Sequence, residues 1–319
     1  MKPELDKREK LLAEWIKGIV GDVTLIPLVN DASARRYYRI ADGERTIIAM
    51  DAPAPESVRD FVDMAERFAD AGLRTPAVHA FEENLGFCLL EDLGDELLCS
   101  HPADSGAYRQ AWQSLLRLQR DVDSSRLPSF DRAFMARELE LFPQWYCAEF
   151  KSRPLTAGEA DAYRQVCEYL IEALLGQAQV AMHRDYHSRN LLVVADGIAI
   201  IDFQGAVRGP ITYDPASFGN DLYASIEPDA ENEMLARFHA DSIREGLPVA
   251  KDLGEYRRLY DCAAIQRLTK ILGLFVRVNQ QLDKPHFLDY LPGCAQTLQA
   301  IASRYQELQP LAEMIEIRQ

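Results

Sequence analysis

The pattern of hydrophobic and polar positions predicts one amphipathic helix followed by a strand-rich region. Over residues 4–20, apolar side chains recur at helical spacing and form a single stripe. Short apolar runs separated by turn residues come next, and the Asp42-Gly43 pair between two of them is typical of a hairpin. A further helix is expected over residues 57–71. The expected strands are Val23–Leu28, Arg36–Ile40, Thr46–Met50, Val78–Phe81 and Phe87–Leu90, with a loop over Val29–Arg35.

From about residue 105 onward the periodicity becomes mainly helical. A long stripe of helical spacing covers residues 260–275, and the main exception is the segment Leu191–Ile201. The change in pattern occurs at the joint Leu90–Asp95. We therefore expect an α+β protein in which a ligand binds in a cleft between two lobes. The N-terminal lobe is expected to cover residues 1–93 and the C-terminal lobe residues 94–319.

Composition narrows the class of protein. The chain has 319 residues, of which 48% are hydrophobic and 27% charged, as in globular proteins. Its net charge of −15 argues against a general nucleic-acid binder, because such proteins are basic. No apolar run approaches the ~18 residues of a membrane span, and the charged N-terminus lacks the apolar core of a signal peptide. We therefore expect a cytoplasmic protein. The six cysteines are irregularly spaced and form no C-x-x-C pair, so we expect them to be reduced thiols.

The segment over residues 182–205 carries the candidate chemistry. Two apolar runs, Leu191–Val194 and Ile198–Ile201, flank an Asp-Gly turn and predict a β-hairpin. A hairpin brings together the residues just outside its open ends, which are here Asn190 and Asp202. Cross-strand neighbours lie about 5 Å apart, and an amide oxygen and a carboxylate at that separation can share a magnesium ion. Asn190 and Asp202 are therefore predicted to be Mg²⁺ ligands.

Asp185 precedes this hairpin on a loop where its carboxylate could accept the proton of an attacking hydroxyl. The order H-x-D-x-x-x-x-N, hairpin, D-F matches the arrangement in kinases, whose catalysis consists mainly of positioning and charge neutralisation. The alternative is that these polar residues only cap turns, as each alone commonly does. His183 and His187 have a spacing that could bind zinc, but they precede a strand. We expect His183 to hold the loop by hydrogen bonds, and His187 to contact substrate or solvent.

The chain lacks G-x-x-x-x-G-K-[ST] and G-x-G-x-x-G, which excludes a P-loop and argues against a Rossmann domain. Its motifs resemble instead the aminoglycoside phosphotransferase family, relatives of choline and protein kinases with a two-lobed kinase-like fold, over nearly the whole chain. The resemblance implies ATP and Mg²⁺ as cofactors, Asp185 as the catalytic aspartate, and Asn190 and Asp202 as the metal ligands. It also implies a hinge whose backbone binds adenine, although the residues alone fit a buried strand equally well. The hinge residues are Glu91, Asp92 and Leu93.

Four separated segments resemble a narrower group, the bacterial anomeric sugar kinases that act on N-acetylmuramate and N-acetylglucosamine in cell-wall recycling. These segments are Asn30–Arg39, Met50–Pro53, Asp202–Asp214 and Gln266–Gly273. In the first segment, the small residues 32–34 let backbone N–H groups approach phosphates. Arg35 or Arg36 could add positive charge. The alternative is that both arginines lie on a solvated strand face. The phosphate contacts expected there come from Ser33, Ala34 and Arg35.

One departure from the wider kinase pattern concerns the strand Thr46–Met50, which should end near a lysine that pairs with the nucleotide phosphates. Met50 stands in that place, and Glu66 on the following helix therefore lacks its usual partner. The narrower group shares the Met-Asp-Ala-Pro run, so the missing lysine is consistent with that group. The residue that binds the phosphates in its place is not identified. A non-catalytic nucleotide-binding protein remains an alternative.

The resemblance also implies the acceptor, a small sugar phosphorylated on its anomeric oxygen. N-acetylmuramate carries a lactyl carboxylate that needs a cationic partner, and Arg208 is the first candidate, with Arg267 and Lys270 behind it. Solvated arginines and lysines are the alternative interpretation of these three residues. His187 and Gln204 complete the predicted substrate site. Another small acceptor, such as an aminoglycoside or a choline-like metabolite, stays open because the negative net charge suits a cationic substrate.

Overall fold

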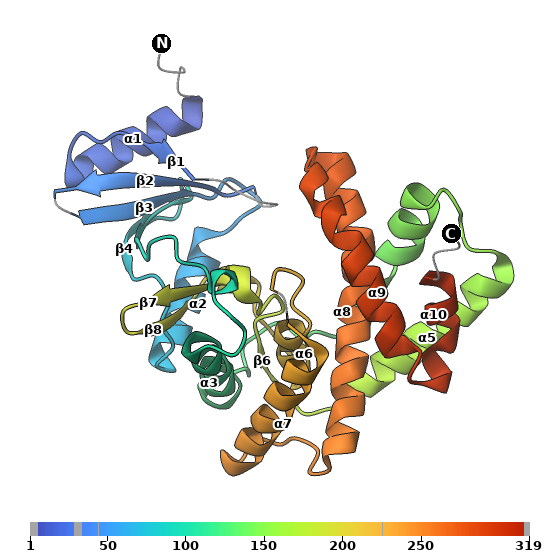
Figure 1. The fold of residues 1–319 in the computed structure, drawn as a ribbon. Coiled ribbons are helices and arrows are strands. Elements are labelled where there is room, and N and C mark those ends of the chain that lie inside the picture. The colour runs from blue at the N-terminus through green and yellow to red at the C-terminus, as the bar shows by residue number, and fades with distance from the viewer. Residues whose placement is uncertain (1–5, 29–33, 44, 225, 316–319) are drawn as a thin grey trace.

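The computed structural model describes residues 6–28, 34–43, 45–224 and 226–315. A sheet with one covering helix forms the N-terminal part and helices dominate the rest, which confirms the predicted α+β class (Figure 1). The larger sheet is antiparallel, with the strand order β1-β2-β3-β5-β4. Its strands are β1 (Ile26–Pro27), β2 (Arg36–Asp42), β3 (Arg45–Asp51), β4 (Val78–Glu82) and β5 (Phe87–Glu91).

The strand predicted over Val23–Leu28 is shorter in the structure. β1 covers only Ile26–Pro27, and both residues are exposed. Proline has no N–H to donate, and strands tolerate it at a sheet edge, which is the position of β1. The predicted loop Val29–Arg35 lies largely outside the described residues.

Helix α1 (Lys7–Val20) covers one face of this sheet (Figure 1). It begins at Asp6, whose carboxylate accepts from the N–H groups of Arg8 and Glu9 in a capping box. The helix predicted over residues 4–20 therefore starts later than expected, and residues 1–5 are not described. Two fully buried residues of α1, Leu12 and Ile16, pack on alternate residues of the sheet. These sheet residues are Tyr38, Ile40, Ile47, Ala49, Phe87 and Leu89.

The opposite face of the sheet packs on the rest of the molecule. Met50 on β3 and Cys88 on β5 alternate with the residues that face α1, and they join a cluster with helix α2 (Val58–Asp70). α2 agrees with the helix predicted over residues 57–71. Its N-cap, Ser57, accepts a hydrogen bond from the N–H of Asp60.

The remainder of the chain is mainly helical and contains two short antiparallel strand pairs. The pair β7 (Leu191–Val194) and β8 (Gly197–Ile200) is the hairpin that the sequence predicts. The pair β6 (Gln179–Met182) and β9 (Val207–Pro210) is not predicted, because runs this short show no alternation. The helical segments are α3 (Gly106–Asp121), α4 (Arg132–Leu139), a π-helical segment (Phe142–Phe150), α5 (Ala157–Leu175), α6 (Tyr213–Gly219), α7 (Pro228–Arg244), α8 (Leu253–Leu282), α9 (Leu291–Ala302) and α10 (Gln309–Ile315).

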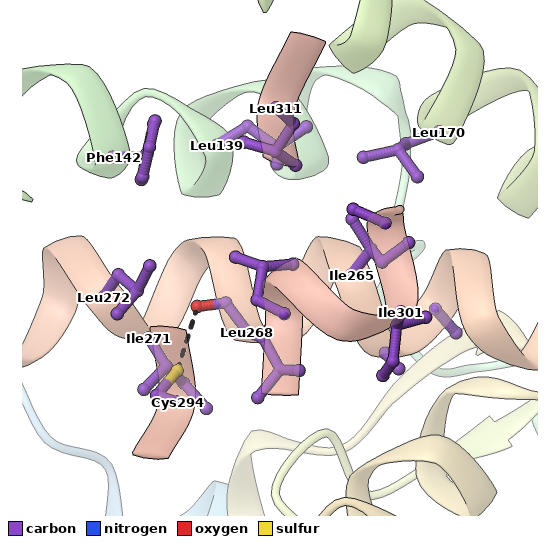
Figure 2. Packing of buried hydrophobic residues seen from close by; sticks show 14 of the residues in the cluster. Leu139, Phe142, Leu170, Ile265, Leu268, Ile271, Leu272, Cys294, Ile301 and Leu311 are labelled. Carbon is purple, nitrogen blue, oxygen red and sulfur yellow. Dashed lines mark hydrogen bonds between the residues drawn. The ribbon is translucent and has the colours of Figure 1, made fainter. Parts of the chain in front are cut away.

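Helix α8 is central to the helical part, and it packs against α5, α9 and the π-helical segment (Figure 1). Figure 2 shows Leu268 and Ile271, two residues of its predicted stripe, among apolar residues of its neighbours, with the Sγ of Cys294 donating to the carbonyl of Leu268 at 3.5 Å. Buried polar residues occupy another part of its circumference. They are Gln266, Arg267, Thr269 and Lys270. α8 therefore links the core to the polar centre of the molecule.

One buried cluster joins the sheet side to the hairpin. The ring of Phe203, just after β8, lies 4.9 Å from that of Phe61 and 5.5 Å from that of Phe68, both on α2. The same cluster includes Met50 and residues of α3, so it spans the joint near residue 93. The division at residue 93 stays a prediction. Within the described ranges, no helix is long and apolar enough to cross a membrane, and the six cysteines are free thiols.

Candidate active site

Asn190 and Asp202 lie at the open end of the β7–β8 hairpin. Leu191 pairs with Ile200, and the N–H of Ile201 donates to the carbonyl of Asn190 at 3.0 Å. This register brings the backbones of the two predicted metal ligands together. Asp202 has a φ of 60°, in the left-handed region, and turns the chain out of the hairpin. The burial of its neighbour Phe203 against α2 fixes that turn.

The loop between β6 and the hairpin presents Asp185. The N–H groups of His183 and Arg184 donate to the two carboxylate oxygens of Asp214, at 2.6 and 2.9 Å. The Nδ2 of Asn190 donates to the carbonyl of Asp185 at 2.9 Å. The loop is thus held from α6 on one side and from the hairpin on the other. Such fixing suits a residue that must orient a reacting group.

Sequence reasoning assigned no role to two buried carboxylates that support this loop. Burial raises the pKa of Asp214 to about 6, although the His183 side chain and the two backbone N–H groups act to lower it. Asp221 accepts from the N–H of Ser188 at 2.7 Å. An aspartate in the first turn of a helix, as Asp214 is, usually complements the helix dipole, so its type and position give no hint of this role. The Nε2 of His183 contacts the carbonyl of Ile201 at 2.9 Å, which is the hydrogen-bonding role expected for it.

Two cationic side chains of α8 lie next to the Asp185 carboxylate. The Nζ of Lys270 is 3.9 Å from its Oδ1 and the Nη2 of Arg267 is 4.0 Å away. Both cations are buried, whereas the Asp185 side chain is 42% exposed. Partial loss of water around the Asp185 carboxylate would alone raise its pKa, but Lys270 and Arg267 outweigh this effect and hold that pKa well below the usual range. Asp185 is therefore ionised and able to accept a proton or a hydrogen bond.

The surroundings of Arg267 favour an anionic ligand. Lys270 has a second anion nearby, since the Oε1 of Glu138 lies 3.7 Å from its Nζ. Glu138 also binds Arg184 at 3.1 Å and accepts from Gln266 at 3.0 Å. The Nε and Nη1 of Arg267, however, are buried without a hydrogen-bond partner among the described residues. Unpaired buried N–H groups are costly, so these donors point to a ligand with acceptor oxygens.

His187 and Gln204, predicted to contact substrate, border the same centre. The Nε2 of His187 lies 3.4 Å from the Nδ2 of Asn190. Burial lowers the pKa of His187 to about 4, so its ring is neutral at pH 7. That ring meets Tyr223 edge-on, with the centroids 4.9 Å apart. The Nε2 of Gln204 donates to the Oδ1 of Asp202 at 2.7 Å.

Arg208 lies apart from this group. It sits on β9 opposite Ala181, and its side chain is exposed. Its side chain makes no hydrogen bond or ion pair with another residue in the described ranges. Of the three cations predicted for an anionic acceptor, the structure brings Arg267 and Lys270 to Asp185 and does not bring Arg208 there.

The segment after β5 contains the predicted hinge. The Glu91 carboxylate binds the guanidinium of Arg74 at 2.5 and 2.7 Å, and the Asp92 carboxylate binds Arg39 at 2.7 and 3.0 Å. Neither Asp92 nor Leu93 makes a backbone–backbone hydrogen bond with another described residue. The two side-chain ion pairs therefore fix the segment. The N–H of Glu91 donates to the carbonyl of Ala77 at 2.8 Å, whereas the backbone groups of Asp92 and Leu93 remain available to a ligand.

The predicted phosphate loop is described only in part. Ser33 lies outside the described residues, and Ala34 is exposed. Arg35 is buried and forms an ion pair with Glu56. Met50, in the usual place of the kinase lysine, is fully buried.

The donor chemistry at the hairpin's open end fits a magnesium ion. Asn190 uses its Nδ2 for the carbonyl of Asp185, which leaves its Oδ1 as an acceptor. Burial raises the pKa of Asp202, and a bound cation would oppose that effect. No group of three or more His, Cys, Asp or Glu side chains in the described part of the chain is placed to hold a metal ion. An ion at Asn190 and Asp202 would therefore need other ligands, as Mg²⁺ on nucleotide phosphates has.

The fold is that of a phosphotransferase. A family model described as the phosphotransferase enzyme family matches residues 24–253, which include the hinge, Asp185, the hairpin and Asp202. The chain belongs to this family, as predicted, and the predicted class of enzyme is confirmed. The two-lobed kinase-like fold is confirmed by a solved ethanolamine kinase of Plasmodium vivax, which has a TM-score of 0.69 and 12% identity. The match covers 95% of this chain and 92% of that one.

The chain is also similar to particular sugar kinases. It is 33% identical over 302 residues to the N-acetylmuramate/N-acetylglucosamine kinase of Pseudomonas aeruginosa, covering 93% of this chain and 89% of that protein. It is 32% identical over 330 residues to the protein of the same name in Pseudomonas putida, covering 98% and 97%. The narrower resemblance predicted from four segments therefore extends over nearly the whole chain.

Proposed function

We propose that this protein is an ATP-dependent kinase that phosphorylates the anomeric hydroxyl of N-acetylmuramate and N-acetylglucosamine in cell-wall recycling. The observation that carries the proposal is the Asp185 carboxylate, held between the open end of the hairpin and two buried cations of α8. The names of the similar proteins support the choice of acceptor. A cytoplasmic location belongs to the same proposal, because the ATP supply is there.

Asp185 is the proposed catalytic residue. Its pKa is held well below the usual range by Lys270 and Arg267 in spite of its partial desolvation, so it is a weak base. Orientation of the attacking hydroxyl therefore contributes more than proton uptake, as in other phosphoryl transfers. An anomeric hydroxyl is more acidic than other sugar hydroxyls, which suits a weak base. The proton moves to the Asp185 carboxylate as the oxygen attacks the γ-phosphorus, and the bond from this phosphorus to the oxygen that bridges it to the β-phosphate breaks, so that ADP leaves.

The nucleotide is proposed to lie between the hinge and the hairpin. Backbone groups of Glu91, Asp92 and Leu93 bind the adenine, and the loop with Ser33, Ala34 and Arg35 approaches the phosphates. Asn190 and Asp202 would hold Mg²⁺ on the phosphates, where the ion supplies charge neutralisation. Gln204 holds one oxygen of Asp202 and keeps that carboxylate in place.

The acceptor is proposed to bind against α8. The buried donors of Arg267 and the ammonium of Lys270 suit the lactyl carboxylate of N-acetylmuramate. His187 is neutral and could accept from or donate to a sugar hydroxyl. Arg208, which the sequence favours for the carboxylate, is a less direct candidate because its exposed side chain does not contact this centre. The buried cations also argue against a cationic acceptor such as an aminoglycoside or a choline-like metabolite.

The test is an acceptor panel with the purified protein, ATP and magnesium. ADP release would be measured for N-acetylmuramate, N-acetylglucosamine, choline and a representative aminoglycoside, and the position of phosphate on each product read by phosphorus NMR. We expect the two N-acetyl sugars to be converted to 1-phosphates. Fast turnover of choline or the aminoglycoside with neither sugar converted would contradict the acceptor. If no acceptor is turned over and the protein nevertheless binds ADP in a separate titration, the non-catalytic alternative would be favoured.

A further inference from the structure

At Met50, the usual position of the lysine that binds the nucleotide phosphates, the protein has no lysine. In kinases a lysine on the third strand binds these phosphates and pairs with a glutamate of the following helix. Here Met50 is fully buried in an apolar cluster, and Glu66 on α2 is exposed to solvent. Neither residue can take part in such a pair. A phosphotransferase still needs positive charge at this position, so another group must supply it.

An ion pair of the same kind lies one strand away. Arg35, immediately before β2, binds Glu56, immediately before the N-cap of α2. The two side chains are 8% and 26% exposed. The pair thus connects a strand of the sheet to helix α2, as the lysine and glutamate do in other kinases.

Arg35 lies on the face of the sheet that carries Met50. Successive residues of a strand point to opposite faces. Arg36 points to the α1 face, where it binds the buried Asp51 at 2.6 Å. Tyr37, the next residue, pairs across the ladder with Met50 and packs in the same cluster. Arg35 shares the side of Tyr37, so it reaches the region that a lysine at residue 50 would serve.

The start of β2, where Arg35 lies, also packs with the end of the hairpin. Tyr37, two residues after Arg35, lies against the buried cluster that contains Met50 and Phe203, and Phe203 directly follows Asp202. The phosphates of a nucleotide held by Asp202 would therefore lie on the side of the sheet that carries Arg35.

We propose that Arg35 replaces the missing lysine as the cation that binds the nucleotide phosphates, and that Glu56 positions it. The inference rests on the proposed function only in assuming that a nucleotide binds beside Asp202. A guanidinium has five N–H donors, so Arg35 can keep Glu56 and donate to phosphate oxygens at the same time. Glu56 is itself held, because its N–H donates to the carbonyl of Pro53 at 3.0 Å.

The experiment compares Arg35→Ala, Arg35→Lys and Glu56→Gln by calorimetric binding of ADP and of adenosine, without sugar. A role at the phosphates predicts that Arg35→Ala weakens ADP binding about 10- to 100-fold and leaves adenosine binding unchanged. Arg35→Lys keeps the charge but cannot donate the paired hydrogen bonds of a guanidinium, so a smaller loss of ADP affinity is expected. Glu56→Gln should weaken ADP binding by about threefold to tenfold, since it only positions Arg35.

The matched control is Arg59→Ala, which removes an exposed arginine paired with Glu83. It should leave both affinities unchanged. Retained adenosine binding in each variant serves as the check on folding. Unchanged ADP affinity in Arg35→Ala, or equal losses for ADP and adenosine, would overturn the assignment. Because no sugar is present, a selective loss of ADP binding supports Arg35 even if the proposed acceptor is wrong.

Discussion

Asp185 is the residue on which the proposed transfer depends, and Asp185→Asn tests it. The amide keeps the size of the side chain but is neutral, so it neither orients the hydroxyl through a charge-assisted hydrogen bond nor accepts its proton. We expect the rate of ADP release with sugar to fall about 10²- to 10⁴-fold. The fold should persist, because the loop is held through backbone groups and not through the Asp185 side chain. Circular dichroism and turnover on the same sample would check both expectations.

A suitable control for that substitution is Asp196→Asn, at the exposed turn of the hairpin. It should keep wild-type turnover. Wild-type turnover in a folded Asp185→Asn protein would remove Asp185 from the catalytic role. Loss of the circular dichroism signal would instead mean that the carboxylate supports the buried cations of α8.

The second prediction at this scale concerns the carboxylate of N-acetylmuramate. Arg267→Ala should lower kcat/KM for N-acetylmuramate about 10- to 100-fold more than for N-acetylglucosamine, which lacks the carboxylate. Arg208→Ala should change the two values equally, because its exposed side chain does not contact Asp185. The selectivity ratio is the measurement, since it cancels losses common to both sugars. A selective loss in Arg208→Ala alone would restore the role that the sequence favours for Arg208.

Single residues show where sequence reasoning succeeds and where it stops. The sequence predicts that Asn190 and Asp202 lie close together, because a short hairpin fixes which residues meet at its open end. The sequence does not predict the roles of Glu138 and Asp214. The contacts of these residues with Arg184 and Lys270 depend on how helices distant in the sequence pack. In the sequence, an aspartate or glutamate of a helical segment has the same pattern around it whether its carboxylate is solvated or holds an active-site loop.

The hinge gives a prediction at the scale of an element. Leu93→Pro removes a backbone N–H from the segment proposed to bind adenine, and it should weaken ATP binding about tenfold or more. Glu91→Gln should have little effect on ATP binding. It loses an ion pair with Arg74 whose partners are about a third exposed, so the free energy of unfolding should fall by only about 0–1 kcal/mol.

Calorimetric titration of ATP into both variants checks this prediction, with urea unfolding for their stability. If Glu91→Gln loses ATP affinity and Leu93→Pro keeps it, the side chain and not the backbone would be the contact. The hinge backbone would then not bind the adenine.

Close packing of α8 leads to a prediction about stability. A Cβ added at Gly273 would lie 2.1 Å from the carbonyl oxygen of Leu141, far inside van der Waals contact. Gly273→Ala must therefore move α8 or the chain at Leu141, and we expect it to lower the free energy of unfolding by about 1–3 kcal/mol or more. Gly293→Ala on α9 has open space and should be neutral or stabilising by about 0.4–1 kcal/mol. Urea unfolding of the two variants makes the comparison, and equal stability would show that the helices can separate without cost.

Elements also differ in how far the sequence predicts them. The β7–β8 hairpin follows from an Asp-Gly turn between two apolar runs. β6 and β9 pair over only four residues each and are far apart in the sequence, so no local pattern marks them. β1 is shorter than its apolar run, because only Ile26 and Pro27 of that run pair with β2.

At the scale of the whole molecule, the proposed site is assembled from both parts of the chain. The sheet side contributes Arg35 and the hinge, the hairpin contributes Asn190 and Asp202, and α8 contributes Arg267 and Lys270. The cluster around Phe203 joins α2 to the hairpin, so the metal ligands and the phosphate side are held relative to each other. The alternation along β2 predicts which face Arg35 takes, but only the packing of α2 places Glu56 beside it.

A nucleotide that bridges these parts should stabilise the folded molecule as a whole. A ligand that binds only the folded state adds about 2.7 kcal/mol at a concentration 100 times its Kd. With ADP and magnesium we therefore expect the thermal unfolding temperature to rise, and with ADP and a chelator the rise should be smaller, because Asp202 and Asn190 then face the phosphates without a cation between them. Asp202→Ala should bind ADP equally with and without magnesium, while Asn190→Ala should keep a weakened dependence. Differential scanning fluorimetry of the three proteins, each with both additions, makes the measurement. An equal rise with chelator and with magnesium in the wild-type protein would show that Asn190 and Asp202 hold no metal, and an unchanged magnesium dependence in Asp202→Ala would place the metal elsewhere.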